Sequence, residues 1–212
     1  MIQTLRGLAV RLALGGAPAA ALPLTLAAAA VALPGCQKYD QLIEADATAD
    51  QRWANVEAQL QRRYDLVPNL VSTVKASAKH EQETLTKVME ARAAATQLKL
   101  SADDLSDPAK VAAFQKAQDN LKGSLSRLLV AQEAYPELKA NQGYRDLQTQ
   151  LEGTENRILR AREEYNAAVK TFNAELGKVG GQVVNKVTGK PFKPRVYFSA
   201  STEAQAAPKV SF

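Results

Sequence analysis

The residues of this sequence that could take part in a reaction are few. Glu152 and Glu155 stand three positions apart on one face of a helix, and two carboxyl groups at that spacing can share a proton. Together with Arg92 they define the catalytic region of a hypothetical enzyme of unrecognised type. Carboxylates near arginines, however, are stabilised as ions rather than held as acids. We therefore expect no catalytic residues and a protein that is not an enzyme.

A structural interpretation accounts better for these charges. Glu81, Arg92, Glu155 and Arg162 fall on or beside apolar helical stripes, where an unpaired charge is costly to bury. We expect them to form an interhelical network of salt bridges and hydrogen bonds that fixes helix register. The only histidine, His80, has charged neighbours on both sides, which favours a solvated helical position over a general base.

The composition excludes most metal and cofactor chemistry. One cysteine and one histidine among 212 residues cannot form the clusters that zinc, haem or iron–sulfur sites need. A net charge of +5 is too small to indicate nucleic acid binding. We therefore expect no metal site, no cofactor and no nucleic acid partner.

The single cysteine, Cys36, ends an N-terminal targeting segment. Arg6 and Arg11 precede an uncharged run from position 12 to 37, in the order of a basic region followed by an apolar region. Gly35 directly before Cys36 resembles the lipobox of a bacterial lipoprotein, in which the thiol receives a diacylglycerol and the chain is cut before it. Residues 1–35 are then a lipoprotein signal peptide, and the mature protein carries fatty acids such as palmitate.

An uncleaved transmembrane helix is the alternative anchor, because the uncharged run exceeds the roughly 20 residues that span a bilayer. Pro18 and Pro23 interrupt this run and weaken that alternative. In both cases the arginines stay in the cytoplasm and everything after Cys36 faces outward, on the periplasmic side. Gln37 after the cysteine, in place of aspartate, resembles lipoproteins exported to an outer membrane, where the cell has one.

Residues 36–176 repeat apolar side chains every three or four positions, which is the period of an amphipathic helix. The repeat predicts an all-α fold: an up-and-down four-helix bundle of long helices. Its four stripes are Tyr39, Leu42, Ala49, Trp53, Val56, Leu60 and Tyr64; Val67, Leu70, Val71, Val74, Ala78, Leu85, Val88 and Met89; Val111, Phe114, Leu121, Leu125 and Leu128; and Tyr144, Leu147, Leu151, Ile158, Tyr165, Val169, Phe172 and Leu176.

Proline and its neighbours mark the expected helix boundaries. Pro68 predicts that the first helix ends near Tyr64 and that a second begins near Pro68, with Asp65 as a cap. The alternative is that Pro68 only kinks one long helix, on which two shorter helices pack. Asp107 followed by Pro108 predicts the start of the next helix.

The stretch from Arg62 to Leu70, Arg-Arg-Tyr-Asp-Leu-Val-Pro-Asn-Leu, resembles the signature of the LemA family of bacterial membrane-anchored helical proteins. Further ordered matches extend the resemblance from about Tyr39 to Asn173. It implies a helical bundle behind an N-terminal membrane segment, outside the cytoplasmic membrane, and it implies no established reaction. The signature residues, expected to have structural or interaction roles, are Arg62, Arg63, Asp65, Pro68, Asn69, His80, Glu81, Arg92, Glu155, Asn156, Arg157, Arg162, Tyr165 and Asn166.

The C-terminal residues 177–212 differ in composition from the body. They contain six basic residues and one acidic residue, several glycines, and aromatic residues such as Phe192, Tyr197 and Phe198. We expect a basic, irregular tail. It either lays its aromatic side chains on the bundle, which we favour, or acts as a flexible tether for an anionic surface.

These features together predict a non-enzymatic, membrane-anchored envelope protein. Its anchor is the lipid or the helix at the N-terminus, and its bundle is displayed outward for interaction with another envelope protein. Long amphipathic helices also allow an alternative, a self-assembling envelope scaffold built from homo-oligomers or coiled coils of the same chain.

Overall fold

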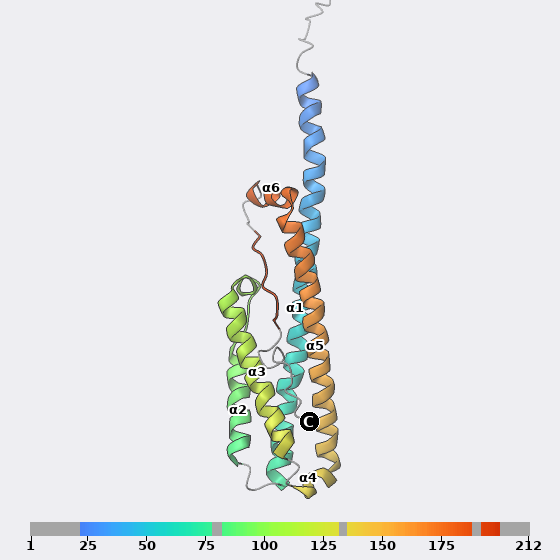
Figure 1. Ribbon diagram of the computed structural model, residues 1–212. Coiled ribbons are helices and arrows are strands. Elements are labelled where there is room, and N and C mark those ends of the chain that lie inside the picture. Colours follow the sequence, from blue (N-terminus) through green and yellow to red (C-terminus); the bar gives the residue numbers. More distant parts are fainter. Residues whose placement is uncertain (1–21, 78–81, 132–134, 188–191, 200–212) are drawn as a thin grey trace, which may run out of the picture. The chain divides into compact units, whose positions relative to one another are not determined.

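The computed structural model describes residues 22–77, 82–131, 135–187 and 192–199 of the chain (Figure 1). Its elements are α1 (Leu22–Ser77), α2 (Gln82–Gln97), the 3-10 helix η1 (Asp104–Ser106), α3 (Pro108–Ala131), α4 (Pro136–Ala140), α5 (Gln142–Gly177) and α6 (Val179–Val187). Residues 192–199 follow as an extended segment. The described residues contain no strand, so the expected all-α class is confirmed.

The chain divides into two compact units, Met1–Gln37 and Lys38–Phe212. The described part of the first unit is the beginning of α1, and much of the expected signal peptide, residues 1–21, lies outside the described residues. Within the described ranges, none of the helices has both the length and the hydrophobicity that a bilayer-spanning helix requires.

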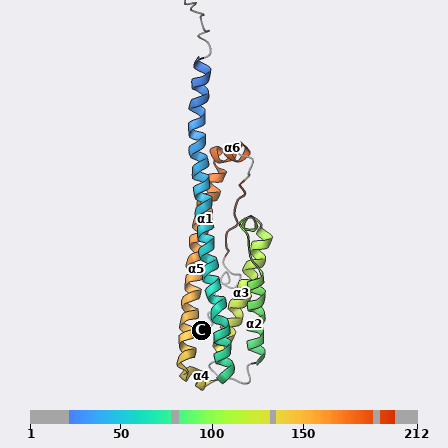
Figure 2. The same ribbon diagram turned by 180° about the vertical axis from the view of Figure 1, so that it is seen from behind.

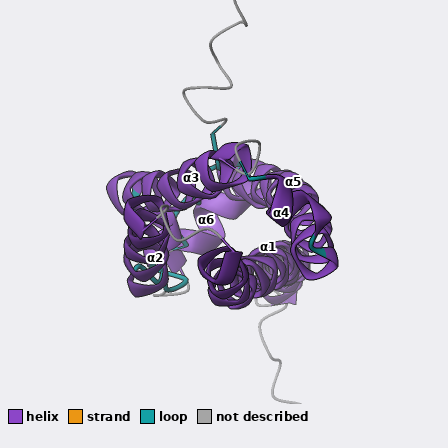
Figure 3. Cartoon of the chain, turned by 90° about the horizontal axis from the view of Figure 1, so that it is seen from below, coloured by secondary structure: helices purple, strands orange, loops and turns teal. Residues whose placement is uncertain are grey.

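Helices α2, α3, α5 and the part of α1 from Lys38 onward pack around a common core. Figures 1 and 2 show α1 and α5 side by side, and Figure 3 shows the four helices around a shared centre. The predicted apolar stripes form this core: Trp53 and Val56 on α1 are at most 6% exposed, as are all five residues of the third stripe. Met89, at 37% exposed, lies outside the core.

Aromatic side chains fill the centre of the core. The ring of Trp53 stacks on Phe198 at 5.7 Å, with an interplanar angle of 11°. Phe114 and Tyr165 meet the same indole edge-on, each at 5.6 Å. Three helices and the extended segment therefore share one aromatic cluster, with Trp53 at its middle.

The predicted break at Pro68 is wrong, because α1 continues through it as one helix. Proline has no N–H, so the carbonyl of Tyr64, four residues earlier, loses its helical donor. Arg92 Nε of α2 donates to that oxygen at 2.7 Å, so a neighbouring helix supplies the missing hydrogen bond. Asp65, the expected cap, lies inside α1 and accepts a hydrogen bond from Gln61 Nε2 at 2.7 Å.

Helix lengths consequently differ from the expected four similar segments. Helix α1 has 56 residues and α5 has 36, whereas α2 has only 16 and α3 has 24. The predicted start of α3 is confirmed: Pro108 is its first residue, and Asp107 Oδ1 accepts a hydrogen bond from the N–H of Ala109 at 2.9 Å. The two shorter helices α2 and α3 pack on the long helix α1. This arrangement matches the alternative in which Pro68 lies within one long helix.

The expected irregular tail is also wrong in part, since Val179–Val187 forms α6 directly after α5. A sharp change of direction at Lys178, with φ −67° and ψ 152°, separates the two helices. A Cβ atom at Gly181 would lie 2.3 Å from the carbonyl oxygen of Glu175. Only glycine allows this approach, so the glycine pair that suggested irregular structure instead permits a tight helix–helix corner.

Candidate functional site

A buried polar network crosses the core, and Arg63 of α1 is its centre. The Arg63 side chain is 2% exposed. Its NH1 group donates to Glu155 Oε1 of α5 at 3.0 Å, and its NH2 group donates to Gln118 Oε1 of α3. One guanidinium therefore joins α1, α3 and α5, and its planar set of donors suits such a junction.

The network continues from Gln118 to α2. Gln118 Nε2 donates to the hydroxyl of Tyr64 at 2.6 Å, and that hydroxyl donates to the carbonyl of Ala95 at 3.3 Å. Ala95 lies in the last turn of α2, where carbonyl groups have no helical partner. Burial raises the pKa of Tyr64, so its hydroxyl keeps the proton that it donates. All four packed helices thus contribute to one connected network.

The proposed catalytic set is not assembled in this network. Glu155 of α5 forms an ion pair with Arg63 of α1 at 3.0 Å. Glu152 is exposed and accepts a hydrogen bond from Gln148 of its own helix. Arg92 is bound to the carbonyl of Tyr64. These side chains serve three separate contacts, so they do not form a reactive centre.

A small cavity of about 140 Å³ adjoins the network, between α1, α3, α5 and the extended segment. Its wall includes Arg63, Gln115, Glu155, Arg162 and Phe198. Arg63 Nε and Gln115 Nε2 are buried donors for which the described residues supply no acceptor. The cavity volume equals that of a few water molecules, and bound water is the usual partner of such donors.

Asparagine side chains hold the extended segment by its backbone. Each amide nitrogen donates to a backbone carbonyl, and each amide oxygen accepts from the N–H of the same residue. All four hydrogen bonds of Asn166 and Asn173 measure 2.9 Å. The three pairs are Asn166 with Phe198, Asn173 with Arg195 and Asn185 with Phe192.

The distance between the two asparagines along α5 is close to the distance between their partners along the extended segment. Asn166 and Asn173 are seven residues apart, about 10.5 Å along a helix. Their partners are three residues apart, about 10 Å along an extended chain. Arg162 adds a hydrogen bond from its NH2 group to the carbonyl of Ser199 at 2.8 Å, and its guanidinium lies 4.9 Å from the centre of the Phe198 ring. Burial lowers the pKa of Arg162.

Tyr165 packs in the same place as these asparagines. It is fully buried, and burial raises its pKa to about 12. Its hydroxyl donates to the carbonyl of Val196 at 3.5 Å, while the N–H of Val196 donates to the carbonyl of Leu105 at 2.8 Å. Three signature residues of α5, Arg162, Tyr165 and Asn166, therefore have a common role, which is to attach the segment 192–199. The favoured packing role of the aromatic tail is confirmed for Phe198, which is 7% exposed, but not for Tyr197, which is 46% exposed.

A second buried cation, Arg195, fastens the other end of the segment to α1. Its side chain is 5% exposed, and its NH2 group lies 2.6 Å from Asp46 and 2.7 Å from Asp50. Burial alone would lower the pKa of Arg195, but the hydrogen bonds that its guanidinium donates to both carboxylates outweigh burial and raise the pKa above its usual value. Arg195 therefore remains charged and neutralises two acids of α1.

The remaining signature residues do not join these contacts. Arg62, Asn69, Asn156 and Arg157 are exposed. The pair Arg62 and Arg63 lies in the middle of α1 and not at a helix end, where such a pair would interact with the terminal carbonyls. Three further predictions cannot be placed: His80 and Glu81 lie outside the described residues, as does the side chain of Cys36.

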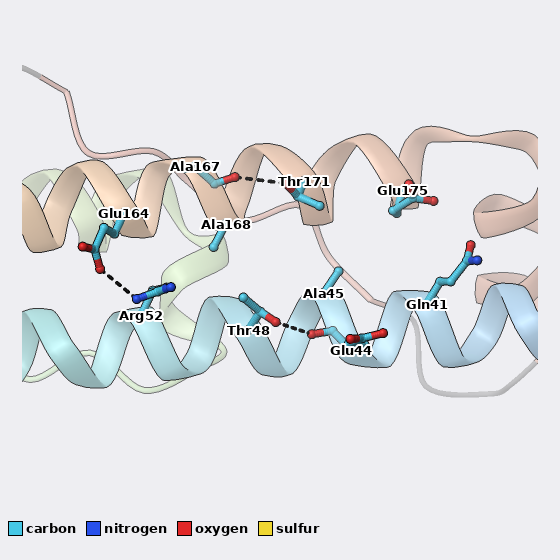
Figure 4. A pocket seen from close by; sticks show the side chains of 10 residues that line it. All are labelled: Gln41, Glu44, Ala45, Thr48, Arg52, Glu164, Ala167, Ala168, Thr171 and Glu175. Carbon is cyan, nitrogen blue, oxygen red and sulfur yellow. Dashed lines mark hydrogen bonds and ion pairs between the residues drawn. The ribbon is translucent and has the colours of Figure 1, made fainter.

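A groove runs along the surface between α1 and α5, with a volume of about 510 Å³ (Figure 4). Its floor consists of small side chains, including Ala45 and Ala168. Arg52 Nη1 and Glu164 Oε2 form an ion pair across it at 2.8 Å. Within the described parts of the chain, no group of three or more His, Cys, Asp or Glu side chains is placed to hold a metal ion.

Gln118 and Arg195 of the site were not predicted from the sequence, although one pattern that Gln118 shares with Arg63 points to it. Arg63 lies between Leu60 and Val67 at spacings of three and four, and Gln118 lies between Phe114 and Leu121 in the same way. Both polar side chains therefore occupy core positions of an apolar repeat. A polar residue at such a position often fixes the register in which helices pack. Nothing in the local sequence indicates the ion pairs of Arg195, because Asp46 lies 149 residues away.

Substitution at Pro68 and Arg92 tests how the continuous helix is stabilised. Arg92→Ala is expected to lower the free energy of unfolding by about 1–2 kcal/mol, because the carbonyl of Tyr64 loses its donor. In a Pro68→Ala background the new N–H can bond to that carbonyl, so the same change should cost less. Urea unfolding of the four proteins of this double-mutant cycle measures the difference. Equal costs in both backgrounds would contradict this role of Arg92, and Arg157→Ala serves as an exposed control.

The sequence is similar to proteins that are named for the magnetosome. Magnetosome proteins MamQ 2 and MamQ 1 of Paramagnetospirillum magneticum strain AMB-1 are each 29% identical over 177 residues, covering 76% of this chain and 64% of theirs. MamQ of Magnetospirillum gryphiswaldense strain MSR-1 is 27% identical over the same shares of the two chains. The chain thus spans less than two thirds of these curated relatives.

The family model that matches the chain begins later than the resemblance noted in the sequence but extends further toward the C-terminus. The motifs end at Asn173, whereas the model includes the extended segment and the residues after it. This agrees with a structure in which residues 192–199 are part of the core. The model describes the LemA family and matches residues 52–212, so the chain belongs to the LemA family.

Proposed function

We propose that this protein is a non-enzymatic, membrane-anchored component of the bacterial envelope. In this proposal, Cys36 carries the lipid and the helical unit faces outward to bind another envelope protein. The observation that supports it most is that the described signature side chains in the core make contacts between structural elements and not a reactive centre. Arg63, Glu155 and Arg92 connect helices, and Arg162 and Asn166 attach the segment 192–199, so these polar side chains maintain the architecture.

The anchor part of the proposal rests on the sequence around Cys36. Two arginines, an apolar run and a small residue before the cysteine are the elements that lipoprotein processing requires. Membership of the LemA family, and likeness to proteins named for the magnetosome, support a role at a membrane. Where the cell has an outer membrane, we propose that membrane as the location.

The groove between α1 and α5 is the surface that we assign to the partner. Its alanine floor leaves space that side chains of another protein can fill, and polar groups such as Glu44 and Glu175 line its rim. The occupant that fits is an apolar segment of an envelope protein with polar residues at its edges. Binding there would remove the alanine floor from water, which is favourable in proportion to the apolar area buried.

Photo-cross-linking in intact cells tests anchor and groove together. A photoreactive residue replaces Thr171 in the groove, and a matched protein carries it at Thr149, which lies outside the groove on the same helix. Cells are labelled with an alkyne fatty acid in addition. We expect the fatty acid to label the wild-type protein and not the Cys36→Ser variant. We expect the photoreactive residue to form adducts with another envelope protein at position 171 and not at position 149.

Each of the other results contradicts a defined part of the proposal. Label on Cys36→Ser, or an uncleaved N-terminus in the wild type, would exclude the lipid anchor. Adducts with twice the mass of the chain would show that the groove binds a second copy of the same protein. This result would favour the self-assembling scaffold. Equal adducts from Thr149 and Thr171 would show that the groove is not the binding surface.

A further inference from the structure

One face of α6 has apolar side chains that no other described residue covers. Val179 is 80% exposed and Val183 is 56% exposed. Lys186 is exposed as well, and the intervals of four and three residues place it on the same helical face. We call Val179, Val183 and Lys186 the α6 face. Exposed valines can enter the headgroup layer of a membrane, and a lysine beside them can extend its charge to the lipid phosphates.

The opposite side of α6 is fixed to the rest of the unit, so the α6 face has a set direction. Gly181 is buried against the last turn of α5. Asn185 pairs with the backbone of Phe192 through both its amide atoms. A Cβ atom at Gly180 would lie 3.3 Å from the side chain of Lys38, so α6 also approaches α1 closely. The valines therefore point outward because the other side of the helix is occupied.

Positive charge that is not neutralised accompanies this face. Lys178 is paired with Glu175, and Arg195 is paired with Asp46 and Asp50. Lys186 and Lys193 are exposed, and neither has a carboxylate within 4 Å among the described residues. Their charges are available to anions outside the protein.

The location of α6 relates it to the anchor. Lys38, which packs on Gly180, stands two residues after Cys36. Two residues span about 7 Å at most, so a lipid on Cys36 would keep the α6 end of the helical unit near the bilayer surface. In Figure 1, α4 marks the opposite end of this unit, where α3 also ends.

We propose that the α6 face, together with Lys193, docks on a bilayer of anionic phospholipids. The valines enter the headgroup layer, and the two lysines pair with lipid phosphates. This inference rests on the proposed function, because such a small surface acts only once the anchor has raised its local concentration at the membrane. Docking would fix the direction in which the groove between α1 and α5 is presented.

A fluorophore on α6 tests the docking in proteoliposomes that contain the full-length lipidated protein. Val183→Cys carries the fluorophore in one protein, and Val130→Cys carries it in the control. Val130 is an equally apolar residue, 70% exposed, near the far end of α3. Quenching by nitroxide-labelled lipid reports contact with the headgroup layer, and flotation of the vesicles reports the anchor separately.

The expected result is quenching at position 183 alone, in vesicles that contain phosphatidylglycerol and not in pure phosphatidylcholine. Raising the salt from about 0.05 M to about 0.5 M should reduce it, because the Debye length shortens from more than 10 Å to less than 8 Å. Lys186→Gln with Lys193→Gln should shift the docking equilibrium by about 25-fold, about fivefold per lysine. Lys116→Gln with Lys122→Gln on α3 should change nothing.

Flotation distinguishes the two proposals when docking fails. A protein that floats but shows no quenching at 183 keeps its anchor and overturns the docking of α6. Equal quenching at 130 and 183, or quenching that is unchanged in neutral lipid, also overturns it. A protein that does not float refutes the lipid anchor, and the docking that depends on it is refuted with it.

Discussion

Replacing Trp53 by alanine is expected to lower the free energy of unfolding by about 3–5 kcal/mol. The indole is 6% exposed and contacts Phe114, Tyr165 and Phe198, so its removal leaves a cavity among three other rings. Rings on separate helices and on the extended segment cannot all move to fill that space. Because Trp53 is the only tryptophan, unfolding in urea has to be followed by circular dichroism.

Two neighbouring aromatic residues provide the comparison for Trp53. Phe198→Ala should also cost several kcal/mol, because that ring is 7% exposed and stacks on the indole. Tyr197→Ala, next to it in sequence and 46% exposed, should cost less than about 1 kcal/mol. A loss below about 1 kcal/mol for Trp53→Ala would mean that this stripe of α1 is not a core face.

Arg63→Met is expected to have the next largest effect, a loss of about 2–4 kcal/mol in the free energy of unfolding. The substitution keeps much of the aliphatic volume but leaves the carboxylate of Glu155 and the amide oxygen of Gln118 without their donor. The lower end of this range reflects Glu155, whose side chain is 26% exposed and can still reach water. Urea unfolding of the purified protein measures the loss.

A second substitution shows whether the lost ion pair causes that effect. Glu155→Gln in the Arg63→Met background removes the uncompensated charge and should recover part of the stability. Arg62→Met, at the exposed neighbouring position, should change the free energy of unfolding by no more than about 0.5 kcal/mol. If Arg62→Met and Arg63→Met had similar effects, the buried network would not contribute to stability.

The sequence predicted the elements that depend on local periodicity. Recurring apolar residues every three or four positions placed Trp53, Phe114 and Tyr165 in the core, and Asp107 with Pro108 placed the start of α3. Both signals act over one or two helical turns, so they can be recognised in any window of that length. The motifs of the LemA family marked several residues of the network but did not indicate their contacts.

The errors came from contacts between distant parts of the chain. Pro68 would end an isolated helix, and only Arg92, 28 residues later, replaces the missing backbone donor. The corner at Gly181 depends on where α5 ends, and a pair of glycines alone suggests irregular structure instead. Interactions of this kind depend on packing that the local sequence does not encode, which is why the tail was predicted to be irregular throughout.

The extended segment 192–199 also determines when the protein can finish folding. It supplies Phe198 to the aromatic cluster and joins Arg195 to Asp46, a contact between residues 149 positions apart. During synthesis from the N-terminus, α1, α2, α3 and α5 are therefore made before the segment that completes their core. Contacts of such long sequence separation form late and slow the folding reaction. A nascent chain halted before Phe198 would hold an incomplete core, so the helices cannot complete their packing until residues 192–199 have been made.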